Sequence, residues 1–319
     1  MNRARPGVPR IVALPGSEAC ATRLAARLRV PGVELESRRF PDGERYLRLR
    51  GDVRDRPVIL AAQLRDPDPQ LPTLFFLADL LREAGATSLT LVAPYLPYMR
   101  QDARFQDGEA ITSASFARWV SRAFDALVTV DPHLHRHRSL DELYAIPACA
   151  LSAAEVVAAW VRRHVHRPAI VGPDVESETA SRTLAERLHC PSVVLRKLRR
   201  GDRRVEMAMP DVAPLAGRTP VLVDDIVSTG HTLAQATRAL VHAGCAVPVC
   251  IGVHAVLDAA PARLLARAGV ERYVTCNTLE ATSNAIDVTP LLAETVRSPT
   301  LHRLRDLKRL GHLRRNIRA

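Results

Sequence analysis

Short apolar runs alternate with longer amphipathic stretches along most of this chain of 319 residues. In the first half the apolar runs are bounded by turn residues and predict strands at Ile11–Leu14, Pro57–Ala62, Ser88–Pro94 and Ala126–Asp131. Two stretches between them, Ala19–Arg29 and Leu71–Ala84, predict helices, and Gly85 suits the C-cap of the second. Strands that alternate with helices are typical of βαβ units, so we expect a parallel sheet with helices packed on it.

The same alternation continues in the second half. It predicts helices at Ala153–Val165, Glu178–Leu188 and Gly230–His242, and strands at Ala169–Pro173, Ser192–Leu195, Arg204–Met209, Pro220–Asp225, Val247–Val253 and Tyr273–Cys276. The halves meet near residues 146–152 and share no close sequence repeat. We therefore predict an α/β protein with two domains, residues 1–148 and 149–297. In residues 298–319 leucines recur at every third position among arginines, which predicts a basic helical extension.

Composition excludes several classes of protein. Hydrophobic residues make up 47% of the chain and charged residues 25%, which is typical of globular proteins rather than disordered or collagen-like ones. No apolar run reaches the roughly 18 residues that a membrane helix needs, and no signal-like apolar core follows the first residues. Six scattered cysteines include no CxxC pair, which argues against a zinc site or a disulfide framework. We expect a soluble protein of the cytoplasm.

The net charge of +11 is unevenly distributed. Residues 298–319 contain seven Arg or Lys and one Asp, so they supply +6 and the rest of the chain supplies +5. A protein that binds nucleic acid usually carries a basic stripe on its folded body. The charge therefore does not favour nucleic acid as a partner, except through the basic tail. Anionic small substrates explain the remaining surplus equally well.

Lysine is nearly absent from the chain. Only Lys197 and Lys308 are lysines among the 45 basic residues. An ammonium and a guanidinium are not interchangeable at a crowded reaction centre, so a retained lysine is a candidate functional group. Lys197 and Arg199 precede Gly201-Asp202, which predicts a turn between two strands. Two cations on a closing loop stabilise charge on a transferred phosphoryl group, whereas the alternative interpretation is a solvated basic hairpin.

The strongest motif is the string Val221-Leu-Val-Asp-Asp-Ile-Val-Ser-Thr-Gly-His-Thr232. A buried strand brings Asp224 and Asp225 to its carboxyl end, where ligands bind in open α/β sheets. Two adjacent carboxylates can bind vicinal ribose hydroxyls, with or without a metal. Backbone N–H groups at the start of the next helix favour a phosphate, and the residues of this candidate loop are Ser228, Thr229, Gly230, His231 and Thr232. The alternative is an ordinary helix start capped by Thr229.

Two further segments carry groups suited to a nucleotide. Phe40 precedes a Pro-Asp-Gly turn, where an exposed aromatic ring can stack on a purine and Asp42 and Glu44 can accept from an exocyclic amine. The alternative is a hairpin turn with a buried Phe. Arg100 follows an apolar run, and arginine makes bidentate contacts to phosphate. A solvated charged loop is the alternative for that segment.

Two strand ends carry candidate metal ligands. Asp174 follows the predicted strand at 169–173, and a carboxylate there suits magnesium, the usual partner of transferred phosphates. His133 follows the strand that ends at Asp131. His135 and His137 continue a histidine run, but this run lacks the further ligands that zinc needs.

Together these motifs resemble those of the ribose-phosphate pyrophosphokinase family, whose fold is that of type I phosphoribosyltransferases. The resemblance covers about residues 8–297 and rests, besides Val221–Thr232, on Arg39–Glu44, Pro94–Asp102, Val130–His133, Gly172–Asp174 and Leu195–Arg199. It implies two phosphoribosyltransferase-like domains, each a mainly parallel sheet flanked by helices. The chain departs from the family at Val175–Glu178, where many members have small residues that cradle pyrophosphate, and at Ser228, where many have a third Asp.

The resemblance implies transfer of the β,γ-pyrophosphoryl group of ATP to the C1 hydroxyl of ribose 5-phosphate, which gives 5-phosphoribosyl 1-diphosphate and AMP. Lys197 and Arg199 would be catalytic, the Asp224–Thr232 loop would bind ribose 5-phosphate, and Mg²⁺ would lie at His133 and Asp174. ATP binding is implied for Phe40, Asp42, Glu44, Arg100, Gln101 and Asp102. A homo-oligomer, at least a dimer, is also implied, because family members commonly complete the nucleotide site with a neighbour's Phe40-type loop.

Two other functions stay open on the same fold. A phosphoribosyltransferase that consumes the diphosphate sugar would share the loop at 224–232, but it would need neither the segments at Phe40 and Arg100 nor a second α/β half. A non-catalytic regulatory or associated subunit would be indicated by loss of Lys197, Asp224 or Asp225, and all three are present.

Overall fold

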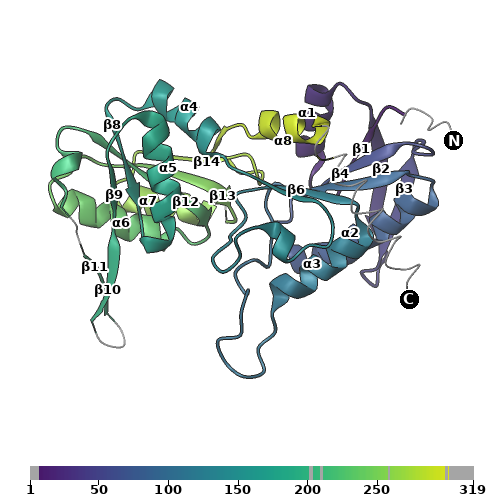
Figure 1. Ribbon diagram of the computed structural model, residues 1–319, viewed down its shortest axis with the longest axis horizontal. Helices are drawn as coiled ribbons and strands as arrows, with labels where there is room; N and C mark the ends of the chain where they lie inside the picture. The colour runs from purple at the N-terminus through teal and green to yellow at the C-terminus, as the bar shows by residue number, and fades with distance from the viewer. Residues whose placement is uncertain (1–6, 201–203, 209–210, 258, 299–300, 302–319) are drawn as a thin grey trace. The chain divides into compact units, whose positions relative to one another are not determined.

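The computed structural model describes residues 7–200, 204–208, 211–257, 259–298 and 301. The chain divides into two compact units: unit 1 comprises Met1–Leu151 with Thr289–Ala319, and unit 2 comprises Ser152–Val288. Each unit has its own sheet and its own apolar core (Figure 1). No helix among the described residues is long and apolar enough to cross a membrane.

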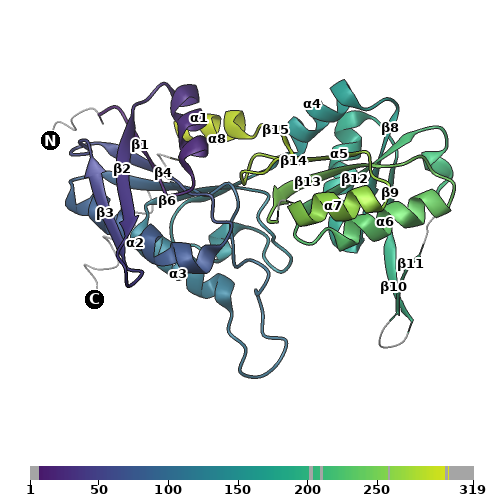
Figure 2. The ribbon, with the colours of Figure 1, turned by 180° about the vertical axis from the view of Figure 1, so that it is seen from behind.

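Unit 1 is built on a seven-stranded sheet with the order β3-β2-β1-β4-β5-β6-β7. The strands are β1 (Arg10–Ala13), β2 (Gly32–Arg39), β3 (Arg45–Arg50), β4 (Pro57–Ala61), β5 (Ser88–Val92), β6 (Ala126–Val130) and β7 (Ala148–Leu151). All neighbours are parallel except β2 and β3, which form an antiparallel hairpin at one edge. Helices α1 (Glu18–Leu28) and α8 (Thr289–Arg297) pack together on one face, and α2 (Pro67–Glu83) and α3 (Thr112–Ala123) on the other (Figures 1 and 2).

The middle strands of unit 1 are continuous apolar runs because helices cover both faces of the sheet. Leu60 on β4, Leu91 on β5 and Leu127 on β6 are 0% exposed. A short 3-10 helix, η1 (Leu140–Glu142), lies between β6 and β7 and buries Leu140. This core fixes the strand ends from which the functional loops of unit 1 emerge.

Unit 2 has a six-stranded parallel sheet with the order β15-β14-β13-β12-β8-β9. The strands are β8 (Pro168–Gly172), β9 (Ser192–Val194), β12 (Thr219–Val227), β13 (Val249–Ala255), β14 (Arg272–Cys276) and β15 (Asn284–Ile286). Helices α4 (Ala154–His164) and α5 (Glu178–Leu188) cover one face, and α6 (His231–His242) and α7 (Ala259–Arg267) cover the other (Figure 2). The unit is completed by 3-10 helices η2 (Val175–Ser177) and η3 (Ala213–Leu215) and by a ribbon of β10 (Arg196–Arg200) and β11 (Arg204–Ala208).

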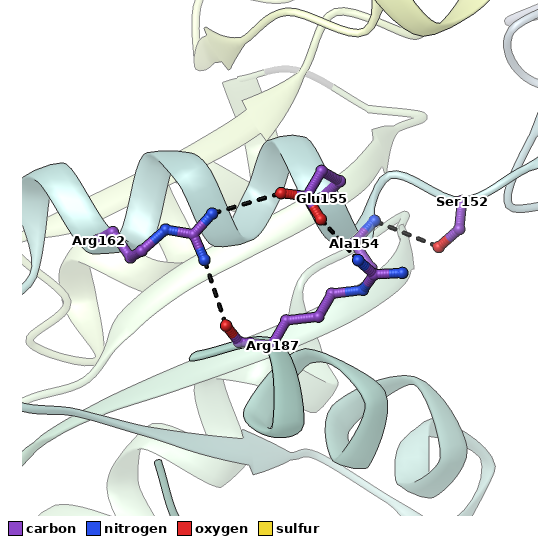
Figure 3. A network of polar contacts seen from close by, with 5 residues as sticks. All are labelled: Ser152, Ala154, Glu155, Arg162 and Arg187. Carbon is purple, nitrogen blue, oxygen red and sulfur yellow. Dashed lines mark hydrogen bonds and ion pairs between the residues drawn. The ribbon is translucent and has the colours of Figure 1, made fainter. Parts of the chain in front are cut away.

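The carboxylate of Glu155 links helices α4 and α5. The two oxygens of Glu155 pair with Arg162 at 3.4 Å and with Arg187 at 2.6 Å, and Arg162 also donates to the Arg187 carbonyl at 3.2 Å (Figure 3). Ser152 Oγ accepts from the amide of Ala154 at 3.2 Å, at the start of the same helix. These charged side chains are about half exposed, so the pairs orient the helices more than they stabilise them.

The predicted α/β fold with two parallel sheets is confirmed. The apolar pattern does not predict the strands β2, β3, β7 and β15 or the helices α3, α7 and α8. Helix α3 opens with Thr-Ser-Ala-Ser, which is typical of a loop, and β7 has only four residues. Helices α7 and α8 have nine residues each and contain a proline near the start.

The chain returns to unit 1 at its last described helix. Helix α8 packs on α1, β6 and β7 and buries Thr289, Leu292, Ala293 and Val296. The sequence-based division assigns residues 289–297 to the second domain, whereas these residues belong to the core of unit 1. Apart from Ser298 and Leu301, the predicted basic extension lies outside the described residues.

Replacing Leu292 with Ala tests whether α8 belongs to the core of unit 1. Leu292 is 2% exposed, so the lost side chain leaves a cavity that we expect to lower the free energy of unfolding of unit 1 by about 2–4 kcal/mol. Amide hydrogen exchange should become faster in α1, β6 and β7 and stay unchanged in β13. Leu257→Ala, at a site that is 44% exposed, is the control and should change little. Faster exchange confined to unit 2 would contradict the assignment of α8.

Candidate active site

The carboxyl ends of β8 and β12 bring three acidic side chains to one edge of the unit 2 sheet. The strands are parallel neighbours, with Val171 opposite Leu222. Asp224 and Asp225 lie two and three positions beyond this pair on β12, and Asp174 lies three positions beyond it after β8. The 3-10 helix η2, which begins directly after Asp174, contacts β12. Ligands of open α/β sheets bind at this edge.

Strand β12 is longer than the sequence indicates. The predicted strand ends at Asp225, whereas β12 continues to Val227 and pairs with β13 as far as Ala255. Asp224 and Asp225 are therefore half-buried residues within the strand rather than the first residues of a loop. Asp225 Oδ1 accepts a hydrogen bond from the amide of Ile226 at 2.7 Å. The strand pairing limits how far either carboxylate can move, which favours precise binding of a ligand.

A buried thiol lies beside this strand. Cys250 on β13 is opposite Leu222 in the register and is 0% exposed. Burial raises the pKa of Cys250 to about 12, and the negative charge of Asp224 adds to the rise. The thiol therefore stays protonated at neutral pH and does not act as a nucleophile.

Gly230 begins α6 in a conformation that other residues adopt at a cost. Its φ is +79°, and a Cβ at this position would lie 3.1 Å from Pro261 Cβ and 3.2 Å from Pro261 Cα. No side chain caps α6, so the alternative of an ordinary cap by Thr229 is not found. Thr229 and His231 are exposed, and Ser228 and Thr232 are half-buried. The uncapped N-terminus of a helix of 12 residues offers its N–H groups and positive end to an anion.

Asp174 starts η2 through a reciprocal cap. Its Oδ1 accepts from the amide of Ser177 at 3.3 Å, and Ser177 Oγ accepts from the amide of Asp174 at 3.3 Å. Gly172 is needed before this turn, since a Cβ there would lie 2.6 Å from Ser177 Oγ and 2.9 Å from Ser181 Oγ. Glu176 and Glu178, the acidic departures from the family pattern, are exposed. The cap is thus built from Asp174 and Ser177 alone.

Lys197 and Arg199 lie on β10, which follows β9 directly. In the antiparallel ribbon the backbone of Lys197 is opposite Met207 and that of Arg199 is opposite Val205. The ribbon projects from the rest of unit 2 (Figures 1 and 2). The predicted strand–turn–strand pattern agrees with this ribbon, and its turn, residues 201–203, lies outside the described residues.

The hairpin of unit 1 presents Phe40 at its tip. Only Gly32 and Val33 of β2 pair with β1, so the rest of β2 extends past the parallel part of the sheet with β3. The amide of Phe40 donates to the Glu44 carbonyl at 2.8 Å, and Asp42 Oδ1 accepts from the amide of Glu44 at 3.1 Å. Phe40 is 38% exposed, so the alternative of a buried ring is not found.

Arg38 packs against the same ring. Its guanidinium carbon lies 4.7 Å from the centroid of Phe40 and 4.3 Å from that of Tyr46, and the two rings meet edge to face at 6.2 Å. Such cation–π contacts hold an exposed ring in one orientation. The sequence motifs do not single out Arg38. The sequence does contain a signal for this contact. Arg38 and Phe40 are two positions apart, and side chains at that spacing lie on the same face of a strand.

The segment after β5 is anchored to α2 and α3. Tyr98 has a φ of +64°, and its hydroxyl donates to Asp68 Oδ1 at 2.5 Å. Partial burial, together with the hydrogen bond and negative charge of Asp68, raises the pKa of Tyr98 well above its usual range. Gln101 accepts from the Thr112 hydroxyl through Oε1 at 3.3 Å and from the Ser113 amide through its carbonyl at 3.3 Å. The Tyr98 contact holds the segment against the N-terminus of α2. The two Gln101 contacts hold it against the N-terminus of α3.

Asp102 is already paired inside the protein. Its side chain is 3% exposed and accepts from Arg136 Nη1 at 2.8 Å, while the side chain of Arg136 is 52% exposed. The guanidinium of Arg136 also lies 5.0 Å from the centroid of the Phe105 ring. Arg100, by contrast, is exposed. Arg136 thus joins the segment at 100–105 to the histidine run, a role that the sequence pattern does not predict.

The histidine run follows β6 in a sharp turn. Asp131 has a φ of +33°, and its amide donates to the Leu151 carbonyl at 2.8 Å. His133 is half-buried and meets the exposed His135 edge to face, with ring centroids 3.9 Å apart. His137 Nδ1 instead lies 3.0 Å from Glu142 Oε2. His133 and His135 therefore lie together, and His137 is directed to a different partner.

The chain is similar to known proteins over nearly its whole length. Residues 9–123 match the N-terminal domain of ribose phosphate pyrophosphokinase, and residues 139–293 match the phosphoribosyl transferase domain. The ribose-phosphate pyrophosphokinase of Methanothermobacter thermautotrophicus is 32% identical over 289 residues, which cover 90% of this chain and 99% of that protein. The enzyme of the same name from Saccharolobus solfataricus is 32% identical over 280 residues, which cover 85% and 94%.

A solved structure shares the fold. The crystal structure of phosphoribosylpyrophosphate synthetase from Mycobacterium smegmatis matches with a TM-score of 0.80 and 23% identity, over 91% of this chain and 98% of that one. The family matches, the relatives and the two-unit fold agree with the motif residues at the strand ends. This chain therefore belongs to the ribose-phosphate pyrophosphokinase family.

Proposed function

We propose that this enzyme transfers the β,γ-pyrophosphoryl group of ATP to the C1 hydroxyl of ribose 5-phosphate. The C1 oxygen attacks the β-phosphorus in line, the bond from that phosphorus to the bridging oxygen of the α-phosphate breaks, and AMP leaves. The products are 5-phosphoribosyl 1-diphosphate and AMP. The main support is the pair of half-buried carboxylates on β12 followed by the uncapped N-terminus of α6, in a chain of this family.

The ribose 5-phosphate half of the site is assigned to unit 2. Asp224 and Asp225 accept hydrogen bonds from the ribose hydroxyls. The 5-phosphate binds the backbone N–H groups of residues 228–232, with the Ser228, Thr229 and Thr232 hydroxyls as further donors and His231 at the exposed rim. The absence of a side-chain cap on α6 supports this assignment, because a cap would compete with the phosphate.

Magnesium fits the carboxylate edge. Asp174, Asp224 and Asp225 offer hard oxygen ligands, which Mg²⁺ prefers. In unit 1, His133 offers an imidazole nitrogen, a poorer direct ligand for Mg²⁺, so we assign it a contact through water with an ion bound to the nucleotide. When bound, Mg²⁺ neutralises phosphate charge and aligns the phosphates.

The ATP half is assigned to unit 1. Phe40, held by Arg38, stacks on the base, and Asp42 and Glu44 accept from its amine. Arg100 contacts phosphate oxygens. Gln101 and Asp102 act in ATP binding by holding Arg100 in place, since each is bonded within unit 1.

Lys197 and Arg199 are assigned to the transition state. Transfer of a phosphoryl group spreads negative charge over non-bridging oxygens, so catalysis depends on positioning and on fixed positive charge. Their place on a ribbon that projects from unit 2 suits groups that close over a bound substrate. Both cations would also hold ATP and sugar away from water.

The alternative functions have less support. A phosphoribosyltransferase that consumes the product would leave the N-terminal family domain at 9–123 unused. A non-catalytic subunit would leave Lys197 and the β12 carboxylates without a role. We further propose that the enzyme acts in the cytoplasm as a homo-oligomer of at least two subunits.

The reaction itself is tested by chromatography of nucleotides after the protein is mixed with ATP, magnesium and ribose 5-phosphate. We expect AMP, formed only when the sugar phosphate is present. ADP would instead indicate a simple kinase. Intact ATP would contradict the proposal and favour the transferase or regulatory alternatives.

Replacing Lys197 with Ala should lower kcat for AMP formation by about 100-fold or more, because one fixed charge at the transition state is lost. The KM for ribose 5-phosphate should change little. The matched control is Lys308→Ala, which removes the other lysine of the chain and should leave kcat unchanged. Equal losses in both variants would contradict a catalytic role for Lys197.

Replacing Gly230 with Ala should raise the KM for ribose 5-phosphate by about tenfold. A Cβ would press on Pro261 and strain a φ of +79°, so the phosphate loop would shift. Gly244→Ala is the control, because Gly244 has a similar φ of +80° but no atom lies within 4 Å of the position that its Cβ would take. An unchanged KM in the Gly230 variant would argue against this loop as the phosphate site.

Replacing Arg136 with Gln removes the partner of the buried Asp102 carboxylate. The segment that carries Arg100 should loosen, so we expect the KM for ATP to rise about three- to tenfold while the KM for ribose 5-phosphate stays the same. Arg138→Gln is the control at an exposed neighbour. Steady-state kinetics with each substrate varied in turn measures both constants, and a rise in the ribose 5-phosphate KM alone would oppose this assignment.

A further inference from the structure

Unit 2 buries a histidine that the proposed reaction does not use. Among the described residues, His254 is the only histidine that is buried, and it is 1% exposed. It is the last residue but one of β13 and lies opposite Ile226 of β12, the residue that follows Asp224 and Asp225. A side chain that can carry a charge is rarely buried without a specific partner. The position of His254 beside the assigned ribose loop therefore calls for an explanation beyond packing.

A hydroxyl on the loop after β14 holds His254. The imidazole Nδ1 lies 2.9 Å from Oγ1 of Thr278, which is 0% exposed and lies two positions beyond the end of β14. The Thr278 hydroxyl donates its hydrogen to the Val253 carbonyl at 2.8 Å. Because a hydroxyl carries a single hydrogen, Thr278 Oγ1 accepts from His254, and the imidazole proton lies on Nδ1. The bond therefore needs a donor on His254 and does not need a charge.

The chain beyond His254 contacts the candidate phosphate loop at two points. The amide of Val256 donates to the carbonyl of Val227, the last residue of β12 before the loop, at 3.0 Å. Pro261, in the first turn of α7, packs so closely on Gly230 that a Cβ at Gly230 would lie 3.1 Å from Pro261 Cβ. A shift at the end of β13 would therefore reach the loop through both contacts.

We propose that His254 and Thr278 are positioning residues for ribose 5-phosphate. Their hydrogen bond holds the end of β13 to the loop after β14, and the chain that follows β13 holds residues 228–232 in the conformation that binds the 5-phosphate. A hydrogen bond inside the core is strong and directional, so it fixes a backbone more exactly than apolar packing does. We assign neither side chain a contact with the substrate. The inference rests on the proposed function and adds two residues that the sequence motifs do not contain.

The first test removes the hydrogen bond and keeps the shape of the side chain. Thr278→Val exchanges the hydroxyl for a methyl group, so we expect the Kd for ribose 5-phosphate, measured by titration calorimetry on the full chain, to rise about tenfold. In AMP formation the KM for ribose 5-phosphate should rise with it, while kcat and the KM for ATP stay close to their wild-type values. Thr278→Ser keeps the hydroxyl and should restore most of the affinity.

Substitutions of His254 test the same bond from its other end. His254→Leu cannot donate and should raise the Kd for ribose 5-phosphate about tenfold, whereas His254→Asn keeps an N–H donor and should retain most of the affinity. His254→Leu combined with Thr278→Val should bind no more weakly than either single variant, because both substitutions remove one bond. Additive losses of affinity in the double variant would contradict the proposed link.

A positioning role is separated from a general loss of stability by hydrogen exchange and by a core variant. In Thr278→Val the bonded amides of Val256 and Ala234, which border the loop, should exchange faster, while those of α4 keep their wild-type rates. Val161→Ala, at a position of α4 that is 0% exposed, destabilises unit 2 without removing this bond. It should leave the affinity for ribose 5-phosphate unchanged. Equal losses of affinity in Val161→Ala and Thr278→Val would overturn the inference.

These measurements distinguish the inference from the proposed function. A wild-type chain that neither binds ribose 5-phosphate nor forms AMP would overturn both. A wild-type chain that does both, together with wild-type affinity in Thr278→Val, would overturn the positioning role alone and leave the proposed reaction standing.

Discussion

The parallel pairing of β8 with β12 is the constraint on which the proposed ribose half of the site depends. It puts Asp174, Asp224 and Asp225 at one edge, although 50 residues separate the first two in sequence. A slip of one residue would turn the Asp224 and Asp225 side chains to opposite faces from those they now occupy. Because β12 continues to Val227 and is paired on the other side by β13, its register is held beyond the acids themselves. The carboxylates are thus placed by the sheet rather than by a loop.

In unit 1 the corresponding groups are placed by side chains. Asp102 is held by Arg136 and Tyr98 by Asp68, and each of these pairs joins the segment after β5 to another part of the unit. Phe40 is held by Arg38 of its own hairpin. A buried carboxylate with one charged partner is a demanding anchor, since loss of the partner leaves a desolvated charge. The candidate site residues are therefore held by different interactions in the two units. Backbone hydrogen bonds between strands hold them in unit 2, and ion pairs, hydrogen bonds and ring contacts between side chains hold them in unit 1.

The fold class and most strands could be predicted because short apolar runs and turn residues are local signals. The motif residues at strand ends could be predicted for the same reason. The predicted end of β12 is too early, because two acidic residues in a row are typical of the end of a strand. The hydrogen bonds between strands involve only the backbone, so β12 continues through both acids. The pairing of Asp102 could not be predicted, because Arg136 is 34 positions away and either residue alone is typical of a solvated loop. The place of α8 depends on packing against α1, nearly the whole chain apart.

The return of α8 makes unit 2 an insertion within unit 1. During synthesis, residues 152–288 leave the ribosome before the last helix of unit 1 exists, so unit 2 can complete its core first. The sheet of unit 1 comes from the earliest part of the chain. Its helix α1 nevertheless stays uncovered until α8 has been synthesised. A nascent chain stopped just after unit 2 would carry a complete unit 2 and a unit 1 that lacks its last helix. The apolar surface that α8 covers on α1, β6 and β7 would then be open to the quality control of the cell.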